Sequence, residues 1–451
     1  MSEGLFWTLR EAFASRKPQK VAKRQRVRLA EMVAFARANS PYYRELYRDL
    51  PDKVEDPTLL PVTSKRELMA RFDDWATDRE VTIGKARAFA GNPDLIGERF
   101  LGKYTLDTTS GTTGTPGIFV LDDRSMAVVS AMALRTLRAW LGLGNFVRIL
   151  AGGGRTAMTI APGSHSATAV AAARLRKSAS GRKRVLVLSV HAPLSEMVSQ
   201  LNEFRPAVLA PYASIARLLA GEQEAGRLNI RPVLMVLAAE GLPISEYDRI
   251  AKVFDAKVET SYAATECMFL SYGCGERWLH VDNDWAVLEP VDADYRPVPP
   301  GEQSHTVLLS NLANRVQPVL RYDLGDSIVL RPDPCPCGNP LPAIRVQGRS
   351  ADVLSFPTDR GDRVSIPPLA LEVDHVPGVE LSQIVQTAPT SLRVRLRPAA
   401  GADPERVWQA VWGEITRLLA AHKLDHVAVE RAEEPPEQSR GGKYRTVIPL
   451  S

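Results

Sequence analysis

The sequence predicts an α/β protein with a large N-terminal domain, containing mixed, largely parallel sheets and a small β subdomain, and a small α+β C-terminal domain. Apolar runs typical of strands alternate with helical stretches between residues 145 and 330, which favours a largely parallel sheet. Beyond about residue 280, short strands separated by Pro, Gly and Asp turns indicate an added antiparallel sheet or barrel. A hairpin, a long amphipathic helix and a last strand fill the final hundred or so residues.

Composition sets the broad class of the protein. The 451 residues suffice for two or three domains, and the hydrophobic share of 45% with 24% charged residues is typical of a soluble globular protein. No apolar run approaches the 18 or so residues of a membrane span, and the N-terminus lacks the pattern of a secretory leader. We therefore expect a cytoplasmic protein with no membrane partner.

The net charge of +5 is modest, although residues 16–28 are locally basic. A solvated helix face is favoured over a nucleic-acid or membrane surface, because no aromatic residues interleave the charges. We therefore expect no nucleic-acid partner.

The first 141 residues predict helices and one strand–loop–strand unit. Residues 23–50 carry apolar side chains at helical spacing, with Ser40 as a helix cap and Pro41 as the first helical residue. Ser64 caps the next helix, with Glu67 at capping-box spacing. Residues 103–121 are predicted as strand, loop and strand, and a helix is predicted from about 123 to 141.

The middle and last parts of the chain divide into predicted strands and helices. The predicted strands of the α/β part are FVRILAGG, VLVLSV, AVLAPY, VLMVLAAE and KVETSYAATE, and its helices are SEMVSQLNEF, SIARLLAGEQEAG and SEYDRIAKVF. The short strands WAVLEPVD, TVLLSNL and SIVLRPD follow, and then come the hairpin SQIVQTAPTSLRVRLRP, the helix PERVWQAVWGEITRLLAAH and the strand HVAVERAEE. We place the domains at 1–347 and 348–451.

The segment TTSGTTGTPG lies in the predicted strand–loop–strand unit. Its glycines let successive backbone N–H groups turn inward and its hydroxyls donate further hydrogen bonds, a combination that suits a polyphosphate. It lacks the Gly-Lys-Ser/Thr ending of a Walker A loop. Taken alone, a plain hairpin turn is favoured.

Four further features have the chemistry of a nucleotide site. Thr265 and Glu266, at the end of a predicted strand, suit a phosphate oxygen and Mg²⁺, although a helix cap is favoured in isolation. Asp326, after a glycine, suits both hydroxyls of a ribose, against an ordinary turn Asp. Arg349 lies at the predicted domain boundary, and Lys443 follows a Gly-Gly loop that would let it swing into another domain's site.

These five features in this order resemble the adenylate-forming ligase superfamily of acyl-CoA synthetases, peptide synthetase adenylation domains and luciferases. The chain is most similar to the phenylacetate-CoA ligase and coenzyme F390 synthetase branch, whose N-terminal pattern is matched by ARANSPYYRELY and LLPVTSKRELMARF. The resemblance covers essentially the whole chain, and it implies a C-terminal domain that is mobile.

The resemblance also implies an activity and a set of site residues. It implies attack of a carboxylate on ATP to give acyl-AMP and pyrophosphate, followed by transfer to CoA, with Mg²⁺ as cofactor. The residues implied are Ser110, Gly111, Thr112, Thr113 and Gly114 for phosphate, Glu240 and Tyr262 for adenine, Thr265 for the α-phosphate, Glu266 for Mg²⁺, Asp326 for ribose, Arg349 for ribose or phosphate, and Lys443 as the adenylation lysine.

Three cysteines and a histidine form a candidate metal site. Cys274, His280, Cys335 and Cys337 offer three thiolates and an imidazole, a set that suits tetrahedral zinc, although their spacing is not that of a zinc finger. The phenylacetate-CoA ligase branch carries a similar arrangement, which favours structural Zn²⁺ over buried or incidental cysteines. Cys267 is left over and is expected to pack near the active-site strand.

The chain departs from its relatives at three places. The phosphate loop lacks the lysine that many relatives place near Thr115 and Pro116, and RYDLGD differs from the usual Tyr-Arg-Thr-Gly-Asp order. At the hinge, where relatives have an acidic pair or Lys with an acid, this chain has Ala351 and Asp352.

The hinge departure leaves the acyl acceptor open. CoA is favoured, and an amine or amino acid, as in indoleacetate-lysine ligases, is the alternative. A nucleotide-binding protein without catalysis is disfavoured by the presence of Glu266, Asp326 and Lys443 together. An aromatic or medium-sized apolar acid would suit a pocket wall containing Tyr212, but a buried structural tyrosine fits that position equally well.

Overall fold

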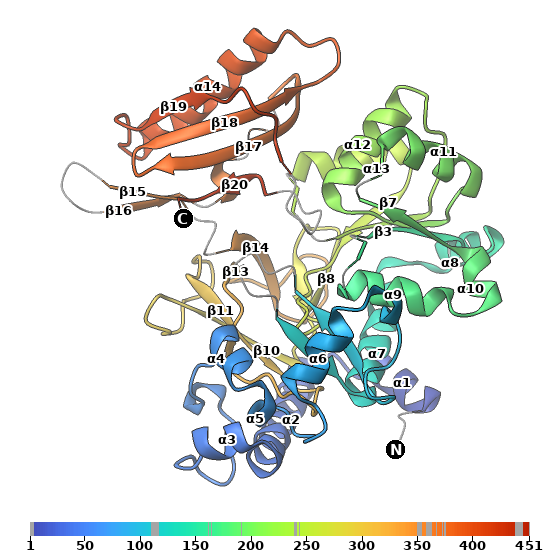
Figure 1. Ribbon diagram of the computed structural model, residues 1–451, viewed down its shortest axis with the longest axis vertical. Coiled ribbons are helices and arrows are strands. Elements are labelled where there is room, and N and C mark those ends of the chain that lie inside the picture. Colours follow the sequence, from blue (N-terminus) through green and yellow to red (C-terminus); the bar gives the residue numbers. More distant parts are fainter. Residues whose placement is uncertain are drawn as a thin grey trace.

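The structure is a computed structural model, shown in Figure 1. It describes residues 4–109, 117–160, 162–163, 165–190, 192–238, 241–242, 244–349, 354–357, 363–366, 368–371, 373, 376–437 and 445–450.

Helices form the first hundred residues and pack around buried aromatic rings, among them Tyr43 and Trp75. The hydroxyls of Ser40 and Ser64 accept hydrogen bonds from backbone N–H groups three residues on, each at 3.3 Å, so both predicted caps are confirmed. The elements are α1 (Leu5–Ala12), α2 (Pro18–Asn39), α3 (Pro41–Leu46), η1 (Pro57–Leu59), α4 (Lys65–Ala70), α5 (Phe72–Trp75), α6 (Ile83–Ala90) and η2 (Pro93–Leu95).

The predicted strand–loop–strand unit is an antiparallel hairpin of β1 (Thr105–Thr108) and β2 (Ile118–Leu121). At its end, the backbone N–H of Gly117 donates to Thr109 Oγ1 at 2.7 Å, and Thr109 N–H donates to the Gly117 carbonyl at 2.9 Å. These two bonds close the neck of the intervening loop. The helix α7 (Asp123–Trp140) follows, close to its predicted bounds.

A five-stranded parallel sheet, in the order β4-β3-β5-β6-β7, forms the centre of the α/β part. Its strands are β3 (Thr156–Ile160), β4 (Val185–Ser189), β5 (Val208–Ala210), β6 (Leu234–Leu237) and β7 (Lys257–Thr260). Helix α8 (Leu143–Ala151) precedes β3, and the helices connecting the strands are α9 (Ala167–Arg176), α10 (Ala179–Arg184), α11 (Leu194–Phe204), α12 (Ala213–Glu224) and α13 (Ile244–Phe254).

One predicted strand was wrong. FVRILAGG lies mostly in α8, and the strand of the sheet is the next segment, β3. Leu143, Phe146, Val147 and Leu150 recur at helical spacing, and Gly152 to Gly154 end the helix. A short apolar run does not by itself distinguish a strand from a helix.

The short strands beyond residue 270 form two antiparallel sheets, β10-β11-β12 and β13-β14-β9-β8, as the turn-rich pattern predicts. Their bounds are β8 (Ser271–Gly273), β9 (Leu279–Val281), β10 (Ala286–Val291), β11 (Thr306–Asn311), β12 (Tyr322–Asp323), β13 (Asp326–Leu330) and β14 (Ala343–Arg349).

The last part of the chain has its own hydrophobic core, formed by residues between Leu354 and Val447. The predicted hairpin is β17 (Val379–Ala388) with β18 (Ser391–Pro398), and the predicted helix is α14 (Pro404–Ala421). The other elements are β15 (Leu354–Pro357), β16 (Arg363–Ile366), η4 (Pro368–Leu371), β19 (Ala428–Arg431) and β20 (Val447–Ile448). The domain division at 347/348 stays a prediction.

Candidate functional site

The segment that follows β7 carries three of the predicted site residues, Tyr262, Thr265 and Glu266, beyond the carboxyl end of the parallel sheet. The chain folds back there, because Ala264 and Cys267 exchange backbone hydrogen bonds at 2.9 and 3.1 Å. The side chain of Asn311 fixes this turn by donating to the Glu266 carbonyl at 2.9 Å. This turn holds Glu266 against the antiparallel strands.

Glu266 is a buried carboxylate that faces Tyr322 of β12. Tyr322 Oη donates to Glu266 Oε1 at 2.8 Å, and the carboxylate is almost fully buried. Burial raises the pKa of Glu266, while the Tyr322 hydrogen bond and the charge of Lys65 lower it. A cation bound near this buried carboxylate would lower its pKa and so stabilise its ionised form.

Asp326, at the start of β13, lies beside the same site. Tyr262 Oη donates to Asp326 Oδ2 at 2.6 Å, and the Asp326 charge further raises the pKa of Glu266. The turn before Asp326 needs a glycine, since Gly325 has φ of +70° and its N–H donates to Asp323 Oδ1 at 2.9 Å. The structure therefore brings together Tyr262, Asp326 and Glu266, which were predicted to bind adenine, ribose and Mg²⁺ respectively.

Arg349 lies opposite Asp326, because the two residues are paired in the antiparallel ladder of β13 and β14. Seven predicted site residues lie outside the described residues: Ser110, Gly111, Thr112, Thr113, Gly114, Glu240 and Lys443. The hinge residues Ala351 and Asp352 also lie outside them. Thr265 is half-buried in the turn beside Glu266, and its role stays a prediction.

Tyr322 and Lys65 are two site residues that sequence reasoning missed. A Cβ built on Gly117 would lie 3.4 Å from Lys65 Cε, so the Lys65 side chain reaches the neck of the loop between β1 and β2. Its charge also acts on Glu266. Lys65 therefore places a cation at the neck of this loop, whose sequence contains no lysine.

Arg321 and Tyr212 have structural contacts. Arg321 Nη1 donates to the Leu60 carbonyl at 2.6 Å, and its Nε approaches Glu289 at 3.3 Å, so it joins the helical region to β12. Tyr212 is 4% exposed and belongs to the core of the parallel sheet, which favours the interpretation as a buried structural tyrosine.

Cys274, His280, Cys335 and Cys337 converge as the sequence predicts. Their ligand atoms all lie within 4.8 Å of one another. The Cys274 and Cys335 sulfurs are 3.8 Å apart, about the separation of two thiolates bound to one tetrahedral zinc at roughly 2.3 Å. His280 Nε2 lies 3.1 Å from Cys337 Sγ. This donor set fits Zn²⁺.

The surroundings of the cluster favour metal binding. His280 Nδ1 is 3.0 Å from the Leu341 carbonyl, which assigns the proton to Nδ1 and leaves Nε2 as a ligand. Burial and the neighbouring thiols of Cys335 and Cys274 raise the pKa of Cys337 to about 12. A bound cation would lower the pKa of these thiols and stabilise them as thiolates. Cys267 is separate from the cluster and packs in the buried turn beside Glu266, as predicted.

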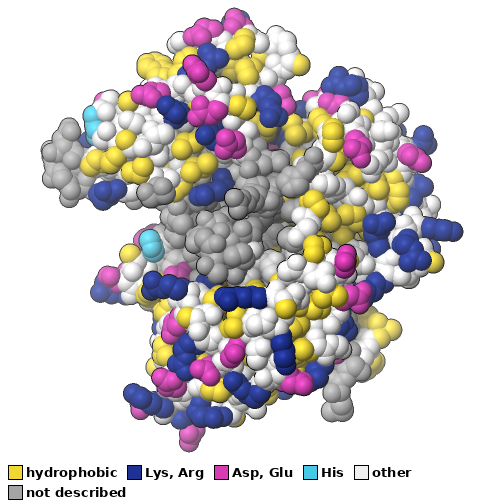
Figure 2. All heavy atoms as spheres, in the orientation of Figure 1, with side chains coloured by type: hydrophobic (Ala, Val, Ile, Leu, Met, Phe, Trp, Pro, Cys, Tyr) yellow, Lys and Arg dark blue, Asp and Glu magenta, His cyan; other side chains and the backbone are white. Residues whose placement is uncertain are grey.

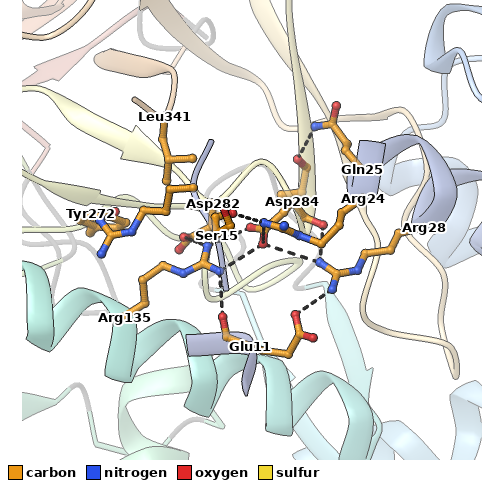
Figure 3. Close-up of polar contacts among 12 residues, drawn as sticks. Glu11, Ser15, Arg24, Gln25, Arg28, Arg135, Tyr272, Asp282, Asp284 and Leu341 are labelled. Atoms are coloured by element: carbon orange, nitrogen blue, oxygen red, sulfur yellow. Dashed lines mark hydrogen bonds and ion pairs between the residues drawn. The ribbon is translucent and has the colours of Figure 1, made fainter. Parts of the chain in front are cut away.

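A buried ion-pair network lies next to β9, the strand that carries His280 (Figure 3). Arg135 of α7 binds Asp282 at 2.9 Å and Asp284 at 2.8 Å. Burial alone would raise the pKa of Asp284, but the hydrogen bonds and charge of Arg135, with the charges of two further arginines, hold it below its usual value. The network fixes the loop after β9.

Arg24 and Arg28 of the basic segment join this network. Arg24 binds Asp284 at 3.2 Å, and Arg28 binds Glu11 at 2.7 Å. The prediction of a solvated helix face is therefore wrong for these two side chains, whereas Lys20 and Lys23 are exposed as predicted. Sequence alone does not reveal the distant carboxylate that pairs with an arginine.

A cavity of about 610 Å³ opens beside the cysteine cluster. Its lining includes Cys274, Cys337, Arg16 and Tyr272, and none of the predicted nucleotide-binding residues. It is therefore distinct from the site around Glu266.

No protein-family model matches the chain, and no curated protein is significantly similar to it in sequence. Solved structures do match. A 2-hydroxyisobutyryl-CoA ligase in its postadenylation state, in complex with R3-HIB-AMP, is 20% identical with a TM-score of 0.67, over 97% of this chain and 90% of that chain.

Two further CoA ligases are similar over a smaller share of the chain. An anthranilate CoA ligase in complex with anthranoyl-AMP has 17% identity and a TM-score of 0.53, over 75% of this chain and 65% of that chain. A benzoate CoA ligase from Burkholderia xenovorans LB400 has 16% identity and a TM-score of 0.50, over 73% and 66%. The chain therefore has the fold of adenylate-forming ligases, with a large N-terminal and a smaller C-terminal domain.

Proposed function

We propose that this chain, which has the fold of adenylate-forming CoA ligases, activates a carboxylic acid with ATP and transfers the acyl group to CoA. The observation that carries the proposal is the convergence of Glu266, Tyr262 and Asp326 in one site. Ligases of this fold have been solved with acyl-AMP and with CoA, which supports the same two half-reactions here.

We assign a different part of the nucleotide to each residue of the site. We assign the Tyr262 ring to adenine and the Asp326 carboxylate to the ribose hydroxyls, since the hydrogen bond between them orients both side chains. Arg349, opposite Asp326 in the sheet, is assigned to ribose or phosphate. Thr265 is assigned to the α-phosphate. The loop residues 110–114, Glu240 and Lys443 keep the roles that the family resemblance implies.

Glu266 is the residue that would hold Mg²⁺. The fit rests on burial, since a carboxylate whose pKa is raised by burial is kept ionised by a cation at short range. When bound, the ion would neutralise phosphate charge. Lys65 adds a fixed positive charge on the loop side of the same carboxylate.

In the first half-reaction, a carboxylate oxygen of the acid attacks the α-phosphorus of ATP. The new bond joins this oxygen to phosphorus, and the bond from phosphorus to the pyrophosphate oxygen breaks, so pyrophosphate leaves with the electron pair. The protein's task is to align two anions and stabilise the charge that builds between them. In the second half-reaction, the acceptor attacks the acyl carbon, its proton is lost and AMP leaves.

The cysteine cluster is proposed to hold a structural zinc ion. Four protein ligands leave no open position for a substrate, so the ion would brace the β8–β9 turn against the 335–337 segment. It would take no part in the chemistry.

For the substrate, we propose an aromatic or medium-sized apolar acid, as in the phenylacetate-CoA ligase branch. An amine acceptor in place of CoA is the second candidate, because Ala351 stands at the hinge position that relatives fill with a charged residue.

The test is to incubate the protein with Mg-ATP and a panel of aryl and alkyl acids, and to trap acyl-AMP with hydroxylamine. We expect hydroxamate with at least one acid, and roughly 10²-fold to 10³-fold less from Lys443→Ala. CoA and amino acids are then offered in place of hydroxylamine. No hydroxamate with any acid would refute adenylation, and product with amines but never with CoA would favour the second candidate.

A further inference from the structure

Helix α8 is amphipathic with its apolar face turned outward. Leu143, Phe146, Val147 and Leu150 share one face of the helix and are 87%, 54%, 58% and 60% exposed. Its partly buried side chains, Asn145 and Ile149, lie on the opposite face, and no residue of α8 is buried. A helix of a globular protein normally buries its apolar stripe, so this ridge needs an external partner.

The chain around this ridge is strongly basic. Residues 124–195 contain eleven Lys or Arg, of which Arg135 is buried in the ion-pair network, and no Asp or Glu. The exposed run Arg182, Lys183 and Arg184 ends α10. In Figure 2, Lys and Arg side chains gather at the right-hand margin, where Figure 1 places α8 and α10.

The sheet brings the basic run to the apolar ridge. Strands β3 and β4 are parallel neighbours, with Thr156 opposite Val185. Helix α8 ends a few residues before Thr156, and α10 ends directly before Val185, so both helices end near the amino ends of these neighbouring strands, on the same side of the molecule in Figure 1. The ridge and the cations therefore form one surface.

We propose that this surface attaches the protein to an anionic lipid membrane, with α8 lying in the interface. An apolar helix face flanked by Lys and Arg is the chemistry that inserts among acyl chains while cations contact lipid phosphates. No single helix of the described chain is long and apolar enough to cross a membrane, and α7 with α8 passes only as a pair bent by 109°. Attachment at the surface fits this geometry.

Other partners fit this surface less well. A second copy of the chain would bring two basic runs together, and like charges oppose such a dimer. A nucleic acid would leave the four apolar side chains exposed. This proposal differs from the expectation from sequence, which was that the protein has no membrane partner.

Flotation of the full-length protein with vesicles tests the proposal. One set is phosphatidylcholine alone, and the other is an equal mixture of phosphatidylcholine and phosphatidylglycerol. We expect at least about tenfold stronger binding to the anionic vesicles, weakened by high salt. The double variant Phe146→Ser with Leu150→Ser should lose about tenfold or more of that binding, because both side chains leave the interface. Lys183→Glu should reduce binding and its salt dependence.

The control is Trp412→Ser on α14, which removes a similarly exposed apolar side chain elsewhere and should leave flotation unchanged. Equal binding to neutral and anionic vesicles, or undiminished binding by the double variant, would overturn the proposal. A wild-type dimer in analytical ultracentrifugation that the double variant converts to monomer, without vesicle binding, would instead assign the ridge to a second copy. The readout needs no catalysis, so it stands apart from the test of the proposed function.

Discussion

Tyr322→Phe should move the acid side of the pH–rate profile upward. The substitution removes only the hydroxyl that donates to Glu266 Oε1 at 2.8 Å. Glu266 is proposed to act as a carboxylate, and its pKa is already raised by burial, an effect that the Tyr322 hydrogen bond opposes. Losing the donor therefore raises the pKa of Glu266 further, and a higher pH is needed to ionise it.

The size of the shift follows from the bond that is lost. A hydrogen bond to a charged group is worth about 1.5–3 kcal/mol. One pKa unit corresponds to about 1.36 kcal/mol, so we expect the acid limb to move up by about one to two pH units. At pH values above the shifted pKa, the rate of the variant should approach that of the wild type.

The assay is acid-dependent pyrophosphate release, measured as kcat/KM for ATP against pH at a fixed, low Mg²⁺ concentration, because this ratio reports the pKa of the free enzyme. Tyr43→Phe is the matched control. It removes another buried hydroxyl, which donates to the Pro318 carbonyl at 2.9 Å in the helical region. An acid limb that stays in place in Tyr322→Phe, or moves equally in Tyr43→Phe, would refute the reasoning.

Three further predictions concern the loop cation, the metal and the ion network. Lys65→Ala should lower kcat/KM for ATP about tenfold to hundredfold in the pyrophosphate assay. The control is Arg66→Ala, which removes the exposed neighbouring side chain and should leave kcat/KM unchanged. Equal losses in the two variants would contradict the assignment of Lys65. One zinc per chain should be found by elemental analysis, and His280→Ala should lose it and melt at lower temperature; metal-free wild type would refute the site. Arg135→Met should reduce the free energy of unfolding in urea by about 3–5 kcal/mol, since it removes the ion pair of the buried Asp282 and one of those of Asp284. Arg296→Met, at the exposed Arg296–Asp294 pair, should cost less than about 1 kcal/mol, and similar losses would argue against the network.

Local signals in the sequence predicted much of the fold. The Ser40 and Ser64 caps and the strand–loop–strand unit follow from short-range chemistry, which needs no knowledge of distant residues. The order of the motifs along the chain predicted that Tyr262, Glu266 and Asp326 would converge. That prediction depended on the resemblance to known ligases, since no local pattern shows that these residues are neighbours.

Other features depend on contacts that the sequence does not display. The segment FVRILAGG is so short and apolar that its pattern does not distinguish a strand from a helix. The apolar face of α8 is exposed, although the apolar face of a helix is usually buried. Lys65 lies far along the chain from Glu266, and only the packing of α4 near the loop neck places it there. In the sequence, Arg24 is likewise part of a basic run, and only the folded structure shows that it pairs with Asp284.

The most direct test of the central claim is the fate of carboxylate oxygen. An acid that gives hydroxamate is labelled with ¹⁸O in its carboxylate and incubated with the protein, Mg-ATP and CoA, and the products are examined by mass spectrometry. If the carboxylate attacks the α-phosphorus, each AMP released carries one ¹⁸O, and pyrophosphate carries none. Unlabelled AMP, or ADP with labelled phosphate, would contradict acyl-AMP formation at the site around Glu266.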